Sequence, residues 1–169
     1  MERVPIKSND CVLDIGCGDG RIIHQWAILL SKALSESGDQ EIGVTISFVG
    51  IDIDPDRIEQ ANKKAKSLKT EGRILSQIRI IFVCKNAMES IDYIKDATII
   101  FLYLIPRGLN KIYPLIMEGH NKMTGRRHLR IISYMSKLPV LTPEGRALCT
   151  AEHQKEAAWP LYFYSIKND

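Results

Sequence analysis

Two aspartates and three glycines lie within ten residues near the N-terminus, in the stretch VLDIGCGDGR at positions 12–21. The apolar residues before Asp14 and the helical spacing after Gly20 predict a short buried strand, a tight turn and then a helix. Glycine lets a backbone turn sharply and approach a ligand closely. The stretch therefore predicts a ligand site in which bare backbone lies beside carboxylates.

The spacing of these residues bears on the chemistry of the ligand. A dinucleotide fingerprint of the form G-x-G-x-x-G needs a third glycine at position 21, where the chain has Arg21. A pyrophosphate would also be repelled by Asp14 and Asp19. A cationic ligand without phosphate avoids this repulsion, and S-adenosylmethionine is one such ligand. We expect Asp14 to accept from its ammonium and the backbone of Gly16 and Gly18 to lie against its methionine and ribose parts.

Two later motifs predict the rest of such a site. In FVGIDIDPDR, positions 48–57, Asp52 ends a strand where it can accept from two ribose hydroxyls. Its neighbour Asp54 precedes Pro55, and this pair is typical of a helix cap and first helical position. In FVCKNAMES, positions 82–90, Asn86 and Ala87 follow a third strand, and we expect them to bind the adenine amino group and to pack against the adenine face.

Strand-like and helical patterns alternate along most of the chain. This alternation, with continuous apolar strands, predicts an α/β fold: a Rossmann-like, doubly wound, mostly parallel seven-stranded sheet with a C-terminal antiparallel hairpin. The strand-like runs are 11–15, 45–53, 78–83, 97–105, 129–135, 146–154 and 160–166. Segments 34–45 and 137–145 are polar or rich in turn residues, and they predict loops.

Helical spacing follows Gly20, Pro55 and Pro106. The apolar positions that define these three helices are Ile22, Ile23, Trp26, Leu29, Leu30 and Ala33, then Ile58, Ala61, Ala65 and Leu68, then Leu109, Ile112 and Ile116.

The three motifs, in this order and each after a strand, resemble the cofactor motifs of class I S-adenosylmethionine-dependent methyltransferases. The segment ATIIFLYLIPRGLNKIYPLI, with IISYM and PLYFYSI, resembles the small group that includes the lysine N-methyltransferases of the ATP synthase c-subunit and of the adenine nucleotide translocase. The resemblance implies S-adenosylmethionine as cofactor and S-adenosylhomocysteine as product. It implies these cofactor-binding residues: Asp14, Gly16, Cys17, Gly18, Gly20, Asp52, Ile53, Asn86, Ala87 and Leu102.

The residues after the fourth strand bear on the methyl acceptor. Methyltransferases that act on planar amino groups usually carry an Asp/Asn-Pro-Pro-aromatic motif here, whereas this chain has Leu-Tyr-Leu-Ile-Pro at 102–106. An apolar, aromatic mouth suits the stem and ammonium of a lysine. We therefore expect a protein substrate with an acceptor lysine, oriented by Tyr103. The alternative for Tyr103 is a tyrosine packed at a buried strand end, and Trp159 either flanks the pocket or belongs to the core.

Two other functions stay open from the sequence. The basic segment GRRHLR, positions 125–130, fits an RNA methyltransferase that contacts phosphates. A catalytically inactive methyltransferase-fold protein that serves as a binding or scaffold subunit is the other alternative, although Asp14, Gly16, Gly18 and Asp52 are all present together.

Length and composition describe the chain as a whole. Its 169 residues predict a single domain, 1–169. Its net charge of +3 neither requires nor excludes a nucleic-acid partner. The N-terminus lacks the apolar region of a signal peptide and the longest apolar run, 97–106, is too short to span a membrane, so we expect a soluble cytoplasmic protein. The four single cysteines predict buried free thiols without a metal site. For the four histidines we expect surface positions.

Overall fold

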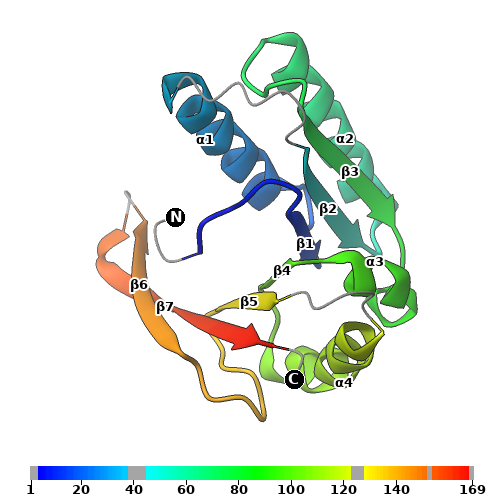
Figure 1. Cartoon of the computed structure of the whole chain (residues 1–169), viewed down its shortest axis with the longest axis vertical. Coiled ribbons are helices and arrows are strands. Elements are labelled where there is room, and N and C mark those ends of the chain that lie inside the picture. The colour runs from blue at the N-terminus through cyan, green and yellow to red at the C-terminus, as the bar shows by residue number, and fades with distance from the viewer. Residues whose placement is uncertain (1–3, 38–44, 123–127, 152–153, 168–169) are drawn as a thin grey trace. The chain divides into compact units, whose positions relative to one another are not determined.

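The computed structural model describes residues 4–37, 45–122, 128–151 and 154–167, and divides into two compact units, Met1–Ala87 and Met88–Asp169 (Figure 1). Strands alternate with helices in both units, parallel pairing prevails, and the C-terminal strands are antiparallel. The predicted Rossmann-like α/β fold class is therefore confirmed. The single domain stays a prediction.

The first unit holds three parallel strands, with β2 hydrogen-bonded to β1 on one side and to β3 on the other. Residue Asp14 of β1 lies opposite Gly50 of β2, and Asp52 at the end of β2 lies opposite Cys84 at the end of β3. Because the strands are parallel, their carboxyl ends lie at one edge of the sheet. The elements are β1 (Cys11–Ile15), α1 (Arg21–Ser37), β2 (Ile46–Asp52), α2 (Pro55–Thr70) and β3 (Ile78–Cys84).

The ring of Phe82 packs closely against two glycines of this unit. A Cβ added at Gly50 would lie 2.5 Å from Phe82 Cδ1, and one added at Gly20 would lie 2.5 Å from Phe82 Cζ. Glycine inside a buried strand commonly marks such a close approach. The Phe82 ring also meets the His24 ring edge to face, with ring centroids 5.3 Å apart.

Helix α1 differs from the prediction in length and in its buried face. It continues to Ser37 and so includes residues expected in the loop 34–45; residues 38–44 lie outside the described part. Its fully buried apolar residues are Ile23 and Ala27, whereas the expected Leu29 is 41 % exposed. Two polar residues share the buried face instead, His24 and Ser31, which obscured the apolar pattern. The predicted buried residues of α2 are all confirmed.

The second unit holds the other strands. Strand β4 is parallel to β5, β5 is antiparallel to β7, and β7 is antiparallel to β6, which confirms the predicted hairpin (orange and red in Figure 1). The elements are α3 (Ile91–Asp96), β4 (Ile99–Leu102), α4 (Pro106–Asn121), β5 (Leu129–Tyr134), β6 (Gly145–Ala151) and β7 (Gln154–Ile166), preceded by a short 3₁₀ turn at Ala87–Glu89.

Two strand boundaries and one additional helix in this unit correct the prediction. Strand β4 has only four residues, because the chain leaves the sheet at Tyr103 before helix α4 begins at Pro106. Strand β7 begins at Gln154, six residues earlier than expected. Helix α3 was not predicted, because six residues carry too little periodic signal. The predicted apolar face of α4 is confirmed as buried.

Several single residues also differ from expectation. His24 and His120 are buried, so the predicted surface positions are wrong for these two; His128 is exposed and His153 lies outside the described residues. All four cysteines are free thiols, yet only Cys17 is buried. Within the described residues, no cluster of three or more His, Cys, Asp or Glu side chains could hold a metal ion. None of the helices described is long and apolar enough to cross a membrane.

Candidate functional site

The turn after β1 requires its glycines. Gly16, Gly18 and Gly20 have φ angles of 79°, 55° and 74°, a region that side chains disfavour. The backbone N–H groups of Gly16 and Cys17 both donate to the carbonyl of Ile51, over 2.8 and 3.0 Å. These bonds hold the turn against the end of β2, so the glycine backbone lies at the carboxyl ends of two neighbouring strands.

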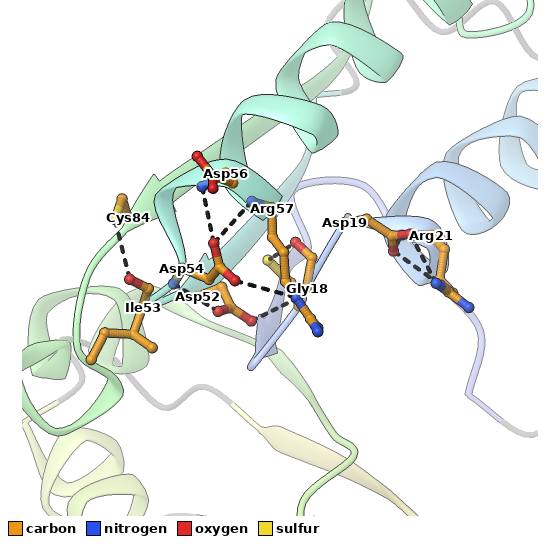
Figure 2. Close-up of polar contacts among 10 residues, drawn as sticks. Gly18, Asp19, Arg21, Asp52, Ile53, Asp54, Asp56, Arg57 and Cys84 are labelled. Atoms are coloured by element: carbon orange, nitrogen blue, oxygen red, sulfur yellow. Dashed lines mark hydrogen bonds and ion pairs between the residues drawn. The ribbon is translucent and has the colours of Figure 1, made fainter.

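Asp52 joins this turn to the turn after β2 (Figure 2). Its Oδ2 accepts the Gly18 N–H over 2.8 Å, and its Oδ1 accepts the Asp54 N–H over 3.0 Å. A carboxylate oxygen can accept more than one hydrogen bond. Asp52 therefore keeps acceptor capacity at both oxygens for a pair of ligand hydroxyls while it fixes both turns.

Asp54 has the separate role that the sequence predicted. Its Oδ1 accepts from the backbone N–H groups of Asp56 and Arg57, over 3.0 and 3.3 Å, and Pro55 opens helix α2. The helix-cap assignment is confirmed. The carboxylate of Asp54 is thus engaged with the helix N-terminus, which leaves Asp52 as the acid of this strand end for a ligand.

Asp14 is a buried acid at the end of β1, with 3 % of its surface exposed. Burial, followed by the nearby charge of Asp52, raises the pKa of Asp14 to about 7. Two carboxylates in a poorly hydrated place repel each other, and one responds by holding a proton. A ligand that brings a positive charge to this place would relieve the repulsion and restore the ionised form of Asp14.

Cys17 lies in the same turn, and its thiol is held in the protonated form. Burial, then the charges of Asp14 and Asp52, raise the pKa of its thiol to about 12. Its Sγ lies 3.7 Å from the carbonyl oxygen of Gly18, to which it donates. The thiolate is the reactive form of cysteine. Cys17 can therefore contribute backbone and packing to a ligand site, and no covalent chemistry.

The ends of β2 and β3 bring three more predicted residues to this edge. The N–H of Lys85 donates to the Asp52 carbonyl over 2.9 Å, and the Cys84 thiol donates to the Ile53 carbonyl over 3.6 Å. The side chain of Ile53 is 70 % exposed, an unusual position for an isoleucine. Asn86, which is exposed, and Ala87, which is half-buried, follow directly. An exposed isoleucine thus directly follows β2, and an amide and a small apolar residue follow β3.

Leu102 and Tyr103 belong to the second unit. The side chain of Leu102 is fully buried, so only its backbone could meet a ligand. Tyr103 is 58 % exposed, which contradicts the alternative that it is packed at a buried strand end. Its ring meets that of Tyr134 edge to face, with centroids 4.9 Å apart. Trp159, on β7, is partly exposed.

Sequence reasoning missed three residues of these regions. Gly50 matters because a Cβ there would lie 2.8 Å from Cys17 Sγ, and its position inside an apolar strand is the signal that could have revealed it. Arg57 pairs with Asp54 at 3.5 Å, and its Nη1 lies 3.4 Å from where a Cβ of Gly18 would be. Tyr134 ends the fifth strand beside Tyr103, a relationship that strand register alone reveals.

A groove of about 460 Å³ lies between helices α1 and α2 and is lined by side chains such as Gln25, Gln60 and Lys64. None of the predicted cofactor residues lines it. The groove lies on the surface of these helices, and Asp19 of the glycine turn also lines it.

An open α/β fold with a glycine turn after the first strand binds its ligand at the carboxyl ends of the strands. A family model described as a methyltransferase domain matches residues 6–157, and the chain belongs to this family. No curated protein matches the chain in sequence.

One solved structure agrees with this chain at the level of the fold. A proposed rRNA methylase from Clostridium thermocellum aligns with 97 % of this chain and 89 % of its own, at 15 % identity and a TM-score of 0.55. The plantazolicin methyltransferase BamL, solved with S-adenosylhomocysteine, aligns at 24 % identity and a TM-score of 0.45. That alignment covers 73 % of this chain and 37 % of BamL, so this chain spans little more than a third of the length of BamL.

Proposed function

We propose that this chain transfers a methyl group from S-adenosylmethionine to a lysine side chain of a protein. The observation that carries the cofactor part is the pair of acids at the ends of β1 and β2. Asp14 is buried and repelled by Asp52, so it suits a cationic ammonium, and Asp52 keeps acceptor capacity for two ribose hydroxyls. A ligand that carries both an ammonium group and a ribose with two free hydroxyls satisfies both acids, and S-adenosylmethionine is such a ligand.

The other residues that we propose for cofactor binding lie at the same edge of the sheet. The backbone of Gly16, Cys17 and Gly18 would lie along the ligand, Ile53 and Ala87 would enclose the adenine, and Asn86 would accept from its amino group. The bound sulfonium supplies an activated methyl carbon. No metal or covalent residue is needed for displacement at such a carbon, because alignment of the nucleophile and exclusion of water are the main requirements.

The acceptor part of the proposal rests on the second unit. A lysine must lose its proton so that the nitrogen lone pair can form the new N–C bond while the C–S bond breaks and its electrons remain on sulfur. Apolar surroundings favour that neutral form. Tyr103 is exposed at the end of β4, followed by the 71 % exposed Ile105. We propose that the Tyr103 hydroxyl orients the amine while such apolar side chains pack against the lysine stem.

The experiment is calorimetric titration of the purified protein with S-adenosylmethionine, S-adenosylhomocysteine and NAD, followed by labelled-methyl transfer to proteins of a cell lysate. Binding of the first two alone supports the cofactor assignment, and base-stable label on lysine supports the acceptor. Tyr103→Phe should lower turnover more than cofactor affinity. Equal turnover in this variant would remove Tyr103 from the acceptor site, and no binding by a folded sample would favour the inactive scaffold alternative.

RNA methylation is the second candidate. Its support is the basic segment 125–130, of which residues 125–127 lie outside the described part, while the likeness to a proposed rRNA methylase concerns the fold alone. Binding to phosphate backbones weakens steeply with salt. Label that enters RNA rather than protein, together with salt-sensitive retention on RNA, would replace lysine with RNA as the acceptor. A cytoplasmic location stays a prediction from the sequence.

A further inference from the structure

Aromatic side chains gather on one face of the second unit's strands. Tyr103 and Tyr134 directly follow the paired residues Leu102 and Ser133, and their rings meet at 65° with centroids 4.9 Å apart. Tyr134 pairs with Leu161 across the antiparallel ladder, so Trp159, two residues along β7, lies on the same face. The two inclined rings meet edge to face and form a corner, of which Tyr103 is 58 % exposed.

The turn after β5 fixes the direction of Tyr134. Met135 has a φ of 68°, which is uncommon for a residue other than glycine and is retained only where the surroundings enforce it. Two hydrogen bonds enforce it here. The Met135 N–H donates to the Pro160 carbonyl over 2.8 Å, and the Ser133 hydroxyl donates to the Ser136 carbonyl over 2.7 Å. A strained turn held by two hydrogen bonds directly follows Tyr134, whose ring contacts the exposed Tyr103, and this points to a positioning role.

One lysine of this region, Lys137, lies on the other face of the strands. Tyr162 pairs with Ser133 and so faces away from Tyr134, and the Lys137 ammonium lies 5.7 Å from the centroid of the Tyr162 ring. The Lys137 ammonium thus lies by a tyrosine on the face opposite Tyr134. Burial, followed by the proximity of Tyr103, raises the pKa of Tyr134, so its hydroxyl stays protonated at neutral pH.

We propose that the corner between Tyr103 and Tyr134 binds the methylated ammonium of the acceptor side chain. This inference rests on the proposed function and adds that the methylated product side chain, up to its quaternary trimethylated form, is bound at the corner after transfer. Ring faces attract cations, and quaternary ammonium groups are bound best in this way because they are weakly hydrated. The exposed apolar side chains of Ile105 and Met135, 71 % and 43 % exposed, are available to the methylene stem.

The first test compares the binding of three small probes in the presence of S-adenosylhomocysteine. Binding is monitored by NMR through the ring resonances of the tyrosines. The probes are the N-acetyl methylamides of Nε-trimethyllysine, of lysine and of the uncharged analogue in which carbon replaces the trimethylated nitrogen. We expect the trimethylated cation to bind about threefold to fivefold more tightly than either of the others. Equal binding of the uncharged analogue, or no binding of the cation, would overturn the proposal.

Variants of Tyr134 separate the contribution of its ring to probe binding from that of its hydroxyl. Tyr134→Phe keeps the ring face and should retain the preference for the trimethylated probe, whereas Tyr134→Leu should lose it. Tyr162→Leu removes a tyrosine from the opposite face of the same strands and should leave the preference unchanged. Loss of the preference in Tyr162→Leu as well, or its retention in Tyr134→Leu, would show that the corner does not bind the probe.

The proposal can fail separately from the proposed function. S-adenosylhomocysteine binding is measured on each variant by calorimetry and should stay within about twofold of the unmodified protein. If the unmodified protein binds S-adenosylhomocysteine and does not discriminate among the probes, the corner proposal alone is wrong. If S-adenosylhomocysteine does not bind the folded protein, the proposed function is wrong, and the corner proposal that rests on it is overturned with it.

Discussion

The backbone N–H of Gly18 donates to the Oδ2 of Asp52 over 2.8 Å, which links two turns that lie 34 residues apart in the sequence. The second oxygen of the same carboxylate accepts the N–H of Asp54. One side chain therefore shapes the glycine turn, supports the start of α2 and presents acceptor capacity at the strand ends. Loss of this carboxylate should affect the stability of the first unit and the affinity for the cofactor together.

Replacement of Asp52 tests this double role. Asp52→Ala leaves two backbone N–H groups without their acceptor, so we expect the free energy of unfolding to fall by about 1–3 kcal/mol. We expect S-adenosylhomocysteine affinity to fall on the order of 100-fold, because the ribose hydroxyls lose a charged acceptor. Urea unfolding and calorimetry measure the two effects. Asp56→Asn removes an exposed carboxylate close by and should leave the affinity unchanged; equal losses in both variants would contradict the assignment.

Cofactor affinity should depend on pH through Asp14. The pKa of Asp14 is raised to about 7, so most of the side chain is protonated at pH 6 and most is ionised at pH 7.5. Because a ligand ammonium requires the ionised form, the affinity for S-adenosylhomocysteine should rise about eightfold over this interval. Calorimetry at several pH values gives the affinity as a function of pH. In Asp14→Asn we expect the affinity to be weak and independent of pH. A profile that matches in both proteins would exclude Asp14 as the ammonium partner.

Stability of the ligand-free protein should show the opposite dependence. The folded pKa of Asp14 lies above its ordinary value, so the folded state binds the proton more tightly than the unfolded state. The stability that this proton confers is complete below the ordinary pKa and is lost as the pH rises through about 7. Asp14→Asn should therefore be more stable than the unmodified protein at pH 8, by up to about 4 kcal/mol, and similar to it at pH 4. Urea unfolding at the two pH values decides this, and a less stable variant at pH 8 would refute the desolvation argument.

A matched pair of glycines separates steric crowding from backbone strain. Gly20 and Gly72 have similar φ angles, 74° and 68°, yet a Cβ at Gly20 would lie 2.5 Å from Phe82, whereas one at Gly72 would meet nothing within 4 Å. Gly72→Ala should cost about 1 kcal/mol from strain alone. Gly20→Ala should cost a further ~1–3 kcal/mol from overpacking. Unfolding of both variants tests the difference, and Phe82→Leu should recover part of the Gly20→Ala loss if the ring is the cause.

The cysteines should differ sharply in reactivity. Cys84 is exposed, while Cys17 is buried and its thiol pKa is raised to about 12. At pH 8 a thiol reagent should label Cys84 first and should label Cys17 only on unfolding, because the thiolate is the reactive form. Mass spectrometry after timed labelling identifies the sites, and Cys84→Ser should remove the fast phase. Rapid labelling of Cys17 in the folded protein would contradict its burial.

Local sequence patterns predicted much of the fold. Alternating apolar runs and helical spacing predicted the fold class and the C-terminal hairpin, and the adjacent residues Asp54 and Pro55 predicted the start of α2. Each of these features depends on neighbours within a few positions, where backbone preferences and capping act. The order of the motifs, each after a strand, likewise predicted which residues would reach the carboxyl ends of β1, β2 and β3.

Tertiary structure decided the features that depend on partners far apart in the chain. The buried face of α1 includes His24 and Ser31, because His24 Nε2 lies 3.1 Å from the Ala61 carbonyl and the Ser31 hydroxyl accepts the Leu75 N–H over 3.0 Å. The sequence named Asp14 and Asp52 as separate ligand contacts, yet only the sheet register places them close enough to raise the pKa of Asp14. Periodicity reports which way a side chain faces along its own element. It carries no information about the distance between side chains of different elements, and burial, charge repulsion and hydrogen bonding all depend on that distance.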